Sequence, residues 1–431
     1  MSNILILAEP VEGHFNPFVP IIKKLVERGH QVKCLTGQLF KDQIENLGAA
    51  FIPLPAQWDA GNQDVYEFFP ALKSLTGLAQ IKFYIKYIMY AQIPDILAVL
   101  DTVLLDFKAD VIIGDTFMVA GTWLRELGGP PSVRLSVLPL SLPGKDIAPF
   151  GLGLLPGTSF FSRLRNNLLN GLFEHVLFRD VQQHVNELRR SVGLQAYEKY
   201  LLTSAIESPD LVLHTSTPAF EYARAALPGN FRFIGPIVLA PKDGYQPPLW
   251  WDDIVHTQNY PVILINQGTL AKDYDDLIRP ALEALKDEKV VVIAVPVKDE
   301  VLNEIPENVR TADYIPFGNL LPYVDVMVTN GGFGGVQNAL AHGVPLVIAG
   351  ASEDKMEVAA RVEHAGAGIN LRTKKPTPEA IRYAILNVLS DSAYKQHASQ
   401  LQQDFARYDA PILAVEYVEE LIANNPSISP K

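Results

Sequence analysis

The hydrophobic positions of the first 140 residues alternate between short apolar runs and longer segments in which apolar residues recur every three or four positions. The short runs predict buried strands, and the periodic segments predict amphipathic helices. This alternation of strand and helix is typical of a parallel sheet covered by helices on both faces. We expect strands at residues 3–8, 31–36, 111–114 and 132–137, and helices at 18–28 and 120–127.

The same pattern restarts after a segment rich in proline and glycine, residues 235–251, where little regular structure is expected. The chain is therefore predicted to form two doubly wound α/β domains, residues 1–238 and 258–411, joined by a linker at 239–257. A last helix, within residues 412–431, is expected to pack back on the first domain. In the second domain we expect strands at 262–266, 290–295, 324–329 and 346–349, and helices at 275–286, 335–342 and 355–366.

Composition narrows the class of protein. Apolar residues make up 48% of the 431 positions and charged residues 19%, a balance that suits sizeable buried cores. The net charge of −12 disfavours a nucleic-acid-binding face, so no nucleic-acid partner is expected. The single cysteine, Cys34, excludes a disulfide and a cysteine-based zinc site within one chain, and it fits a reducing, cytoplasmic location.

No transmembrane segment is predicted. The apolar N-terminus is too short for a signal peptide and is followed at once by Glu9 and Glu12. The longest apolar stretch, residues 78–105, is interrupted by Lys82 and Lys86 and falls short of an unbroken span of about 20 residues. We interpret it as amphipathic helices over a core or an apolar pocket.

Four glycines stand between a predicted strand and a predicted helix at residues 326–340. Glycine lets the backbone approach a ligand, and the start of the helix presents free N–H groups and a positive dipole end. The turn is therefore a candidate phosphate site, although the same turn also occurs where a strand and a helix merely pack tightly. It contains neither the G-x-G-x-x-G pattern of dinucleotide-binding proteins nor the lysine of a P-loop.

Two further strand ends should lie at the same edge of this sheet. Asp354 follows the strand at 346–349. Because a carboxylate beside a phosphate site must serve another group, we expect Asp354 to bind sugar hydroxyl groups. The alternative is that Asp354 caps the next helix. The turn after the strand at 262–266 holds Gly268 and Thr269. Their backbone N–H and hydroxyl could meet a phosphate, or the segment is a simple turn.

His14 follows the first strand of the first domain, in the loop between that strand and the first helix. A histidine at this edge can accept a proton at neutral pH, although a loop histidine also serves as a surface or capping residue. Asp115 ends a strand that should lie near the first one, and an Asp–His pair fixes the imidazole tautomer. Asp110 is the competing carboxylate, but it precedes its strand and so lies at the wrong end. His175 and His184 are interpreted as solvated.

Other catalytic classes are poorly supported. No G-x-S-x-G nucleophile turn, no H-E-x-x-H segment and no other tight metal-ligand spacing is present, so neither a hydrolase triad nor a metal site is predicted.

These residues resemble those of the family 1 glycosyltransferases of the GT-B architecture, above all the bacterial and fungal enzymes that glycosylate macrolides, phenolics and other lipophilic small molecules. The resemblance covers essentially the whole chain and implies two Rossmann-like domains facing across a deep cleft. It rests on Gly13-His14-Phe15-Asn16-Pro17, on 314–322, on Asn330-Gly331-Gly332 with residues 339–345, and on Asp354-Lys355.

The resemblance also implies roles for the matching positions. His14 would be the general base and Asp115 its partner, and Asp354 would bind the sugar hydroxyls. Thr269 and the backbone of residues 331–335 would hold the diphosphate, with Ile315 and Phe317 facing the nucleobase. The full set of expected donor-binding residues is Gly268, Thr269, Ile315, Phe317, Asn330, Gly331, Gly332, Phe333, Gly334, Gly335, Asp354 and Lys355.

Two positions depart from the family pattern. Asn330 stands where the family usually has histidine, and Lys355 where it has glutamine. Asn330 can still donate an N–H to a phosphate oxygen but cannot carry a charge. The usual donor, UDP-glucose, is expected from the family alone.

The expected reaction is an inverting transfer of a sugar from a nucleotide sugar to a hydroxyl of a lipophilic small molecule, without metal or other cofactor. Aromatic residues after the second strand suggest an apolar acceptor site with Phe83, Tyr87 and Phe117, although such residues are equally consistent with ordinary core. A sugar-nucleotide epimerase or hydrolase on the same fold, and a non-catalytic activator or binding subunit, are the alternatives.

Overall fold

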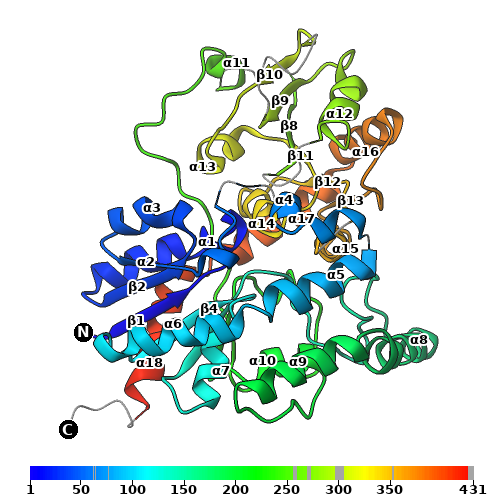
Figure 1. Cartoon of the computed structure of the whole chain (residues 1–431). Helices are drawn as coiled ribbons and strands as arrows, with labels where there is room; N and C mark the ends of the chain where they lie inside the picture. The colour runs from blue at the N-terminus through cyan, green and yellow to red at the C-terminus, as the bar shows by residue number, and fades with distance from the viewer. Residues whose placement is uncertain are drawn as a thin grey trace.

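The computed structural model describes residues 1–425 except residues 62, 64, 76, 256–259, 269–272, 297–304 and 352–353. Two parallel sheets lie in two separate bodies, drawn in blue to green and in yellow to orange in Figure 1. The sequence prediction of an α/β protein with two parallel sheets is therefore confirmed.

The first sheet has the order β3-β2-β1-β4-β5-β6-β7, and its described pairs are all parallel. The predicted strands occur with ends shifted by at most one residue, while β3, β6 and β7 were not predicted. The strands are β1 (Asn3–Leu7), β2 (Gln31–Thr36), β3 (Ala50–Pro53), β4 (Val111–Asp115), β5 (Ser132–Ser136), β6 (Leu211–His214) and β7 (Phe231–Phe233).

Helices cover both faces of this sheet, because apolar side chains point from it in both directions. One face packs on α2 (Phe18–Glu27) and the other on α6 (Ile93–Asp106) and α7 (Ala120–Glu126). The remaining helices of this body are α1 (Glu12–Phe15), α3 (Lys41–Asn46), α4 (Val65–Phe68), α5 (Gly77–Tyr84), α8 (Phe160–Leu172), α9 (Arg179–Ser191) and α10 (Leu201–Glu207).

The second sheet has the order β10-β9-β8-β11-β12-β13 and is also parallel. Its edge strands β10 and β13 were not predicted. The strands are β8 (Val262–Asn266), β9 (Val291–Val295), β10 (Val309–Thr311), β11 (Val326–Thr329), β12 (Leu346–Ile348) and β13 (Gly368–Asn370). The helices around it are α11 (Trp251–Val255), α12 (Ile278–Leu285), α13 (Phe317–Leu320), α14 (Phe333–Ala341), α15 (Lys355–His364), α16 (Pro378–Ser390) and α17 (Ser392–Phe405).

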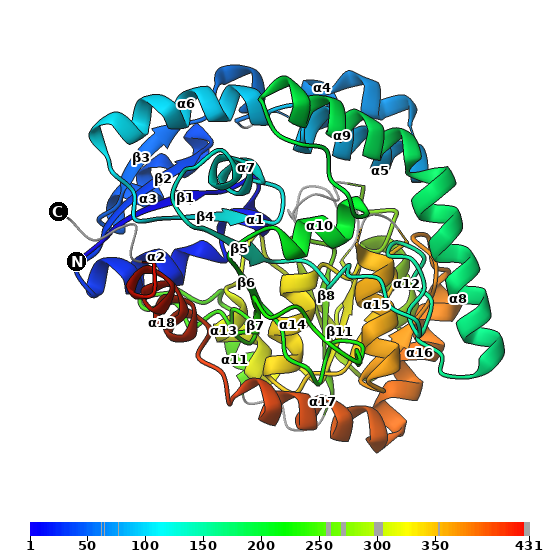
Figure 2. The ribbon, with the colours of Figure 1, turned by 90° about the horizontal axis from the view of Figure 1, so that it is seen from below.

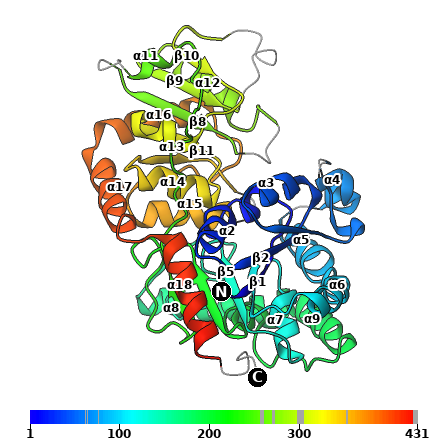
Figure 3. The same cartoon turned by 90° about the vertical axis from the view of Figure 1, so that its left-hand side faces the viewer.

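The chain crosses between the two bodies twice. It leaves the first after β7, and it returns after α17 through α18 (Ala410–Ala423), which lies beside α2 in Figure 3. Ala414, Val415 and Val418 of α18 pack in the same core as Ile21 and Leu25 of α2. The two bodies are therefore joined by two chain segments, one between β7 and α11 and one between α17 and α18.

The apolar stretch Gly77–Asp106 is long and apolar enough, by length and composition, to cross a membrane, with a mean hydropathy of 1.6 and 44% of that window buried. Core helices meet the same criterion. In the structure, Met89, Ile93 and Leu100 from this stretch belong to the core beside Trp123. Figure 2 shows α5 beside α9, where Lys82 pairs with Asp180 at 2.7 Å.

Candidate active site

The ends of β1 and β4 bring His14 and Asp115 together. The register pairs Leu7 with Gly114, so the loops that follow these strands leave the sheet side by side. His14, on the short helix α1, makes a hydrogen bond between its Nδ1 and the Asp115 carboxylate. The side chain of Asp115 is fully buried, and that of His14 is 12% exposed. The predicted pair is thus present, with His14 as its more accessible member.

Asp115 is held firmly. Its second carboxyl oxygen accepts the backbone N–H groups of Phe117 at 3.1 Å and Met118 at 2.8 Å. With the Nδ1–H of His14 donated to Asp115, the Nε2 atom is left to accept a proton. Asp110 instead accepts the N–H of Asn3 at 2.7 Å, at the opposite end of the sheet.

Burial lowers the pKa of His14, but the carboxylates of Asp115, Glu9 and Asp354 outweigh that effect, so that the pKa lies above its ordinary value. Asp354 belongs to the second body and is the smallest of these contributions. The three carboxylates all favour the imidazolium form of His14.

Aromatic rings flank the histidine. Phe117 lies 4.3 Å from the His14 ring and 5.6 Å from Tyr84, measured between ring centroids. Phe83 and Tyr87 form a second pair at 5.0 Å, and Tyr87 is an exposed residue. The predicted acceptor residues therefore fall into two groups, and among the described ring contacts Phe117 is the one of the three that touches His14.

The prediction that His184 is solvated is wrong. His184 is half-buried, contacts the Tyr87 ring at 5.3 Å between centroids, and its Nε2 is buried without a hydrogen-bond partner, so it is not solvated. The polar residues around it on α9 gave no sign that α5 and the turn after it would cover this position.

The donor-side residues gather at one edge of the second sheet. Thr329 of β11 pairs with Asn266 of β8 on one side and with Ile348 of β12 on the other. Asn330, which follows Thr329, donates its side-chain N–H to the carbonyl of Gln267. This contact places Asn330 against Gly268, and it uses one of the amide hydrogens that we expected to face a phosphate.

The glycine turn leaves room above the start of α14. Gly331 has φ +90°, a conformation that favours glycine, and a side chain there would collide with Ile348. Side chains at Gly332 and Gly334 would meet nothing, and no side chain caps α14. The start of α14 therefore has no side-chain cap and has room beside two of its glycines, as a phosphate site requires.

Two expected donor residues have buried side chains. Those of Ile315 and Phe333 are 3% and 5% exposed and belong to the hydrophobic core. Phe333 was expected to contact the diphosphate through its backbone, so its prediction does not depend on where the ring lies. Phe317 is half-buried near Gly335. Thr269 lies outside the described residues.

Asp354 and Lys355 begin α15, next to the glycine turn. Asp354 stands at the N-cap position of α15, and its side chain makes no capping hydrogen bond there. The packing of this corner is tight, because a side chain at Gly350 would overlap the carbonyl of Asn330 and the side chain of Lys355.

A buried ionic network connects the two bodies one turn further along α15. Arg361 pairs with Glu221 of the first body at 2.8 Å and with Glu357 at 3.1 Å, and its side chain is 1% exposed. Glu357 accepts the N–H groups of Gly151 and Gly153, both at 2.9 Å. Sequence reasoning missed these residues, because an ion pair separated by 140 positions leaves no local signal.

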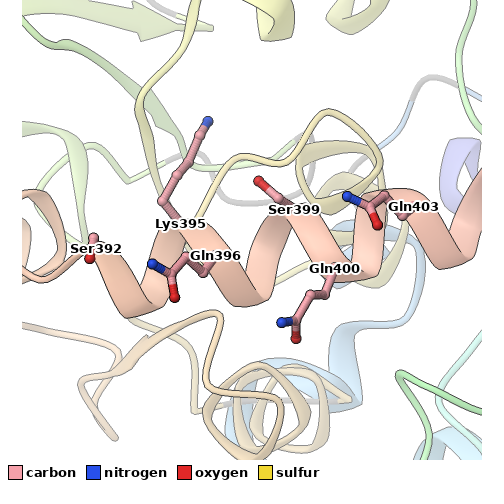
Figure 4. Close-up of a pocket in the computed structure, with 6 residues that line it drawn as sticks. All are labelled: Ser392, Lys395, Gln396, Ser399, Gln400 and Gln403. Atoms are coloured by element: carbon pink, nitrogen blue, oxygen red, sulfur yellow. The ribbon is translucent and has the colours of Figure 1, made fainter.

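A hollow lined by six polar side chains runs along α17 (Figure 4). All six come from that single helix, and none is a predicted site residue: Ser392, Lys395, Gln396, Ser399, Gln400 and Gln403. Within the described ranges, no cluster of three or more His, Cys, Asp or Glu side chains could hold a metal ion.

Comparison with known proteins identifies relatives of this chain. Residues 280–422 match the family model described as erythromycin biosynthesis protein CIII-like, C-terminal domain. The chain is 39% identical to 4'-demethylrebeccamycin synthase of Lentzea aerocolonigenes, over 98% of this chain and 100% of that protein. It is 30% identical to UDP-glucosyltransferase A1 of Starmerella bombicola, over 98% of this chain and 93% of that protein.

The chain belongs to the family 1 glycosyltransferases. Its fold is GT-B: the structure of the calicheamicin glycosyltransferase CalG4 matches over 100% of both chains with a TM-score of 0.75 and 22% identity. The spinosyn rhamnosyltransferase SpnG, complexed with thymidine diphosphate, matches 97% of this chain and 100% of that chain, with a TM-score of 0.69 and 18% identity. The protein is therefore an enzyme that transfers a sugar, and not a non-catalytic subunit.

Proposed function

We propose that the enzyme transfers glucose from UDP-glucose to a hydroxyl group of a lipophilic small molecule, with inversion at the anomeric carbon. The observation that carries this proposal is the His14–Asp115 pair, in which the carboxylate fixes the tautomer of the histidine and leaves Nε2 to accept a proton. The UDP-glucosyltransferase of Starmerella bombicola supports the choice of nucleotide and sugar.

In the proposed mechanism, the acceptor hydroxyl gives its proton to Nε2 of His14 as its oxygen attacks the anomeric carbon. The bond to the diphosphate breaks on the opposite side, which inverts the configuration. Asp115 stabilises the imidazolium that forms. The start of α14 and the open positions at Gly332 and Gly334 suit the negative charge of the departing diphosphate.

Acceptor and donor would approach from opposite bodies. Phe117 contacts the His14 ring, so an apolar acceptor lying on Phe117 would present its hydroxyl to the base. Asp354 would accept hydrogen bonds from the sugar hydroxyls. Phe83 and Tyr87 would extend the apolar surface further from the base.

His14→Ala tests the base. Removing a general base typically lowers the rate by about 10²–10⁴. We expect that loss in kcat with an aliphatic alcohol as acceptor, with UDP affinity unchanged in calorimetry. His175→Ala is the matched control, because His175 is exposed on a segment away from β1 and β4. Transfer by His14→Ala at the wild-type rate would show that another group acts as base.

The donor and the rival reactions are tested by products. UDP-glucose and TDP-glucose are compared as donors, and mass spectrometry follows the glycosylated acceptor. An epimerase or hydrolase would convert the nucleotide sugar without forming an adduct. We also propose that no metal is required, so that full activity in EDTA is expected.

A further inference from the structure

A second carboxyl group lies buried beside the His14–Asp115 pair. Glu9 follows β1 by two residues, and because Leu7 pairs with Gly114, the backbone beyond Leu7 runs toward the position of Asp115. Glu9 is only 5% exposed. The loop is turned by the N–H of Val11, which donates to the Glu9 carbonyl at 2.7 Å.

The surroundings of Glu9 come from three elements. Gln92, 2% exposed and placed just before α6, donates its side-chain N–H to the Glu9 carboxyl at 3.1 Å. Asp115 of β4 acts on it as a like charge, and His14 of α1 as an opposite charge. Burial and Asp115 raise the pKa of Glu9 to about 7, against the smaller opposite effects of Gln92 and His14.

This arrangement is not what packing alone would favour. A buried carboxyl beside another carboxyl costs free energy, and an amide of the same shape would meet Gln92 without that cost. The electrostatic effect also runs in the other direction, since Glu9 is one of the groups that raise the pKa of His14.

We propose that Glu9 is a positioning residue for the sugar transfer, whose carboxylate acts through His14 to strengthen the base. The proposal rests on the role of His14 proposed above. When the acceptor O–H bond breaks, its proton moves to Nε2 of His14, and the imidazolium then faces the carboxylates of Asp115 and Glu9. The ionised form of Glu9 stabilises that product of the proton transfer, whereas the protonated form does not.

The proposal gives the transfer a second dependence on pH. Glu9 is protonated below neutral pH and then resembles a glutamine, so Glu9→Gln and the wild type should transfer sugar at similar rates near pH 5.5. At pH 9, where Glu9 is ionised, we expect kcat of Glu9→Gln to be about three- to tenfold lower. The KM for the nucleotide sugar should not change, since Glu9 belongs to the first body and is hydrogen-bonded there to Gln92.

Two further variants sharpen the test. Glu12→Gln removes an exposed carboxylate from the same loop and should follow the wild-type profile at every pH. Gln92→Leu removes the hydrogen bond that favours the ionised form of Glu9. In this variant, the rise in kcat that follows ionisation of Glu9 should therefore occur at a higher pH than in the wild type. Nuclear magnetic resonance of ¹⁵N-histidine-labelled protein, with His14→Ala to assign the signal, should show a lower pKa for His14 in Glu9→Gln.

The outcomes separate this inference from the proposed function. A Glu9→Gln profile that superposes on that of the wild type, or that is lower by one constant factor at all pH values, overturns the role of Glu9. If His14→Ala is also inactive, only Glu9 is excluded. If His14→Ala remains active, the base itself has been assigned wrongly.

Discussion

Glu9→Gln should make the folded protein more stable above neutral pH, although it weakens catalysis there. The folded structure raises the pKa of Glu9 from its ordinary value of 4.5 to about 7, mainly by burial and then by the charge of Asp115. A carboxyl group whose pKa rises on folding favours the folded state below pH 4.5, and this contribution is lost as the pH rises through about 7.

The rise from 4.5 to about 7 corresponds to about 3 kcal/mol, because one pKa unit is worth about 1.4 kcal/mol. At pH 8 the wild type carries this full penalty, whereas glutamine is neutral and can still accept the N–H of Gln92. Burial of the new amide offsets part of the gain. We therefore expect Glu9→Gln to raise the free energy of unfolding at pH 8 by about 1–3 kcal/mol. For a domain of this size, this corresponds to a rise in Tm of roughly 2–10 °C.

Urea unfolding, followed by tryptophan fluorescence at pH 5 and pH 8, measures the difference between variant and wild type. The stabilisation should be about four times larger at pH 8 than at pH 5, and Glu12→Gln should show no such change. A difference that is equal at both pH values would refute the reasoning, because it would mean that Glu9 is ionised in the folded protein throughout this range.

Three other predictions follow from the structure. Arg361→Met leaves the Glu221 carboxylate buried without its main partner, so the free energy of unfolding should fall by about 3–5 kcal/mol in the same urea assay. The control Arg382→Met removes a surface pair with Glu288 and should lower the free energy of unfolding by at most about 1 kcal/mol. Phe117→Ala should raise the KM for a lipophilic acceptor about three- to tenfold in steady-state kinetics and leave the donor KM unchanged. Asn330→His should tighten UDP binding in calorimetry, and unchanged affinity would mean that this side chain does not meet the diphosphate.

Most central strands could be predicted because they are largely buried and so form short, mostly apolar runs, although the buried strand β6 was missed as well. Residues 31–36 and 262–266 were predicted with the bounds of β2 and β8. The edge strands β3 and β7 were not predicted because they are short and partly exposed. β7 is three residues long with an exposed arginine at its centre, and β3 has two half-buried residues between two exposed ones. Neither pattern differs from that of a loop.

Topology also predicted the meeting of His14 and Asp115, since the carboxyl ends of neighbouring parallel strands share one edge of a sheet. Side-chain direction was not predictable in the same way. Ile315 and Phe333 lie in segments that resemble the donor site, but only the packing of β11, α13 and α14 shows that their side chains enter the core. Glu9 was visible next to the first strand, yet an acidic residue in a loop is usually solvated, so its burial became apparent only from the structure.

The position of Asp354 relative to His14 depends on how α15 is held, and the buried network gives α15 an unusually stiff attachment. Arg361 and Glu357 lie on the first two turns after Asp354, and both are bonded to the other body, through Glu221 and the backbone of residues 151 and 153. Opposite charge from Arg361 keeps the pKa of Glu221 below its usual range despite burial, so this attachment stays charged at neutral pH. A flexible surface contact would let the donor-side carboxylate move freely against the base. A desolvated pair instead permits such movement only at the cost of exposing or separating its charges. The helix that begins after Asp354 is therefore bonded to the body that carries His14, and this attachment would support the proposed direct transfer between the two bodies.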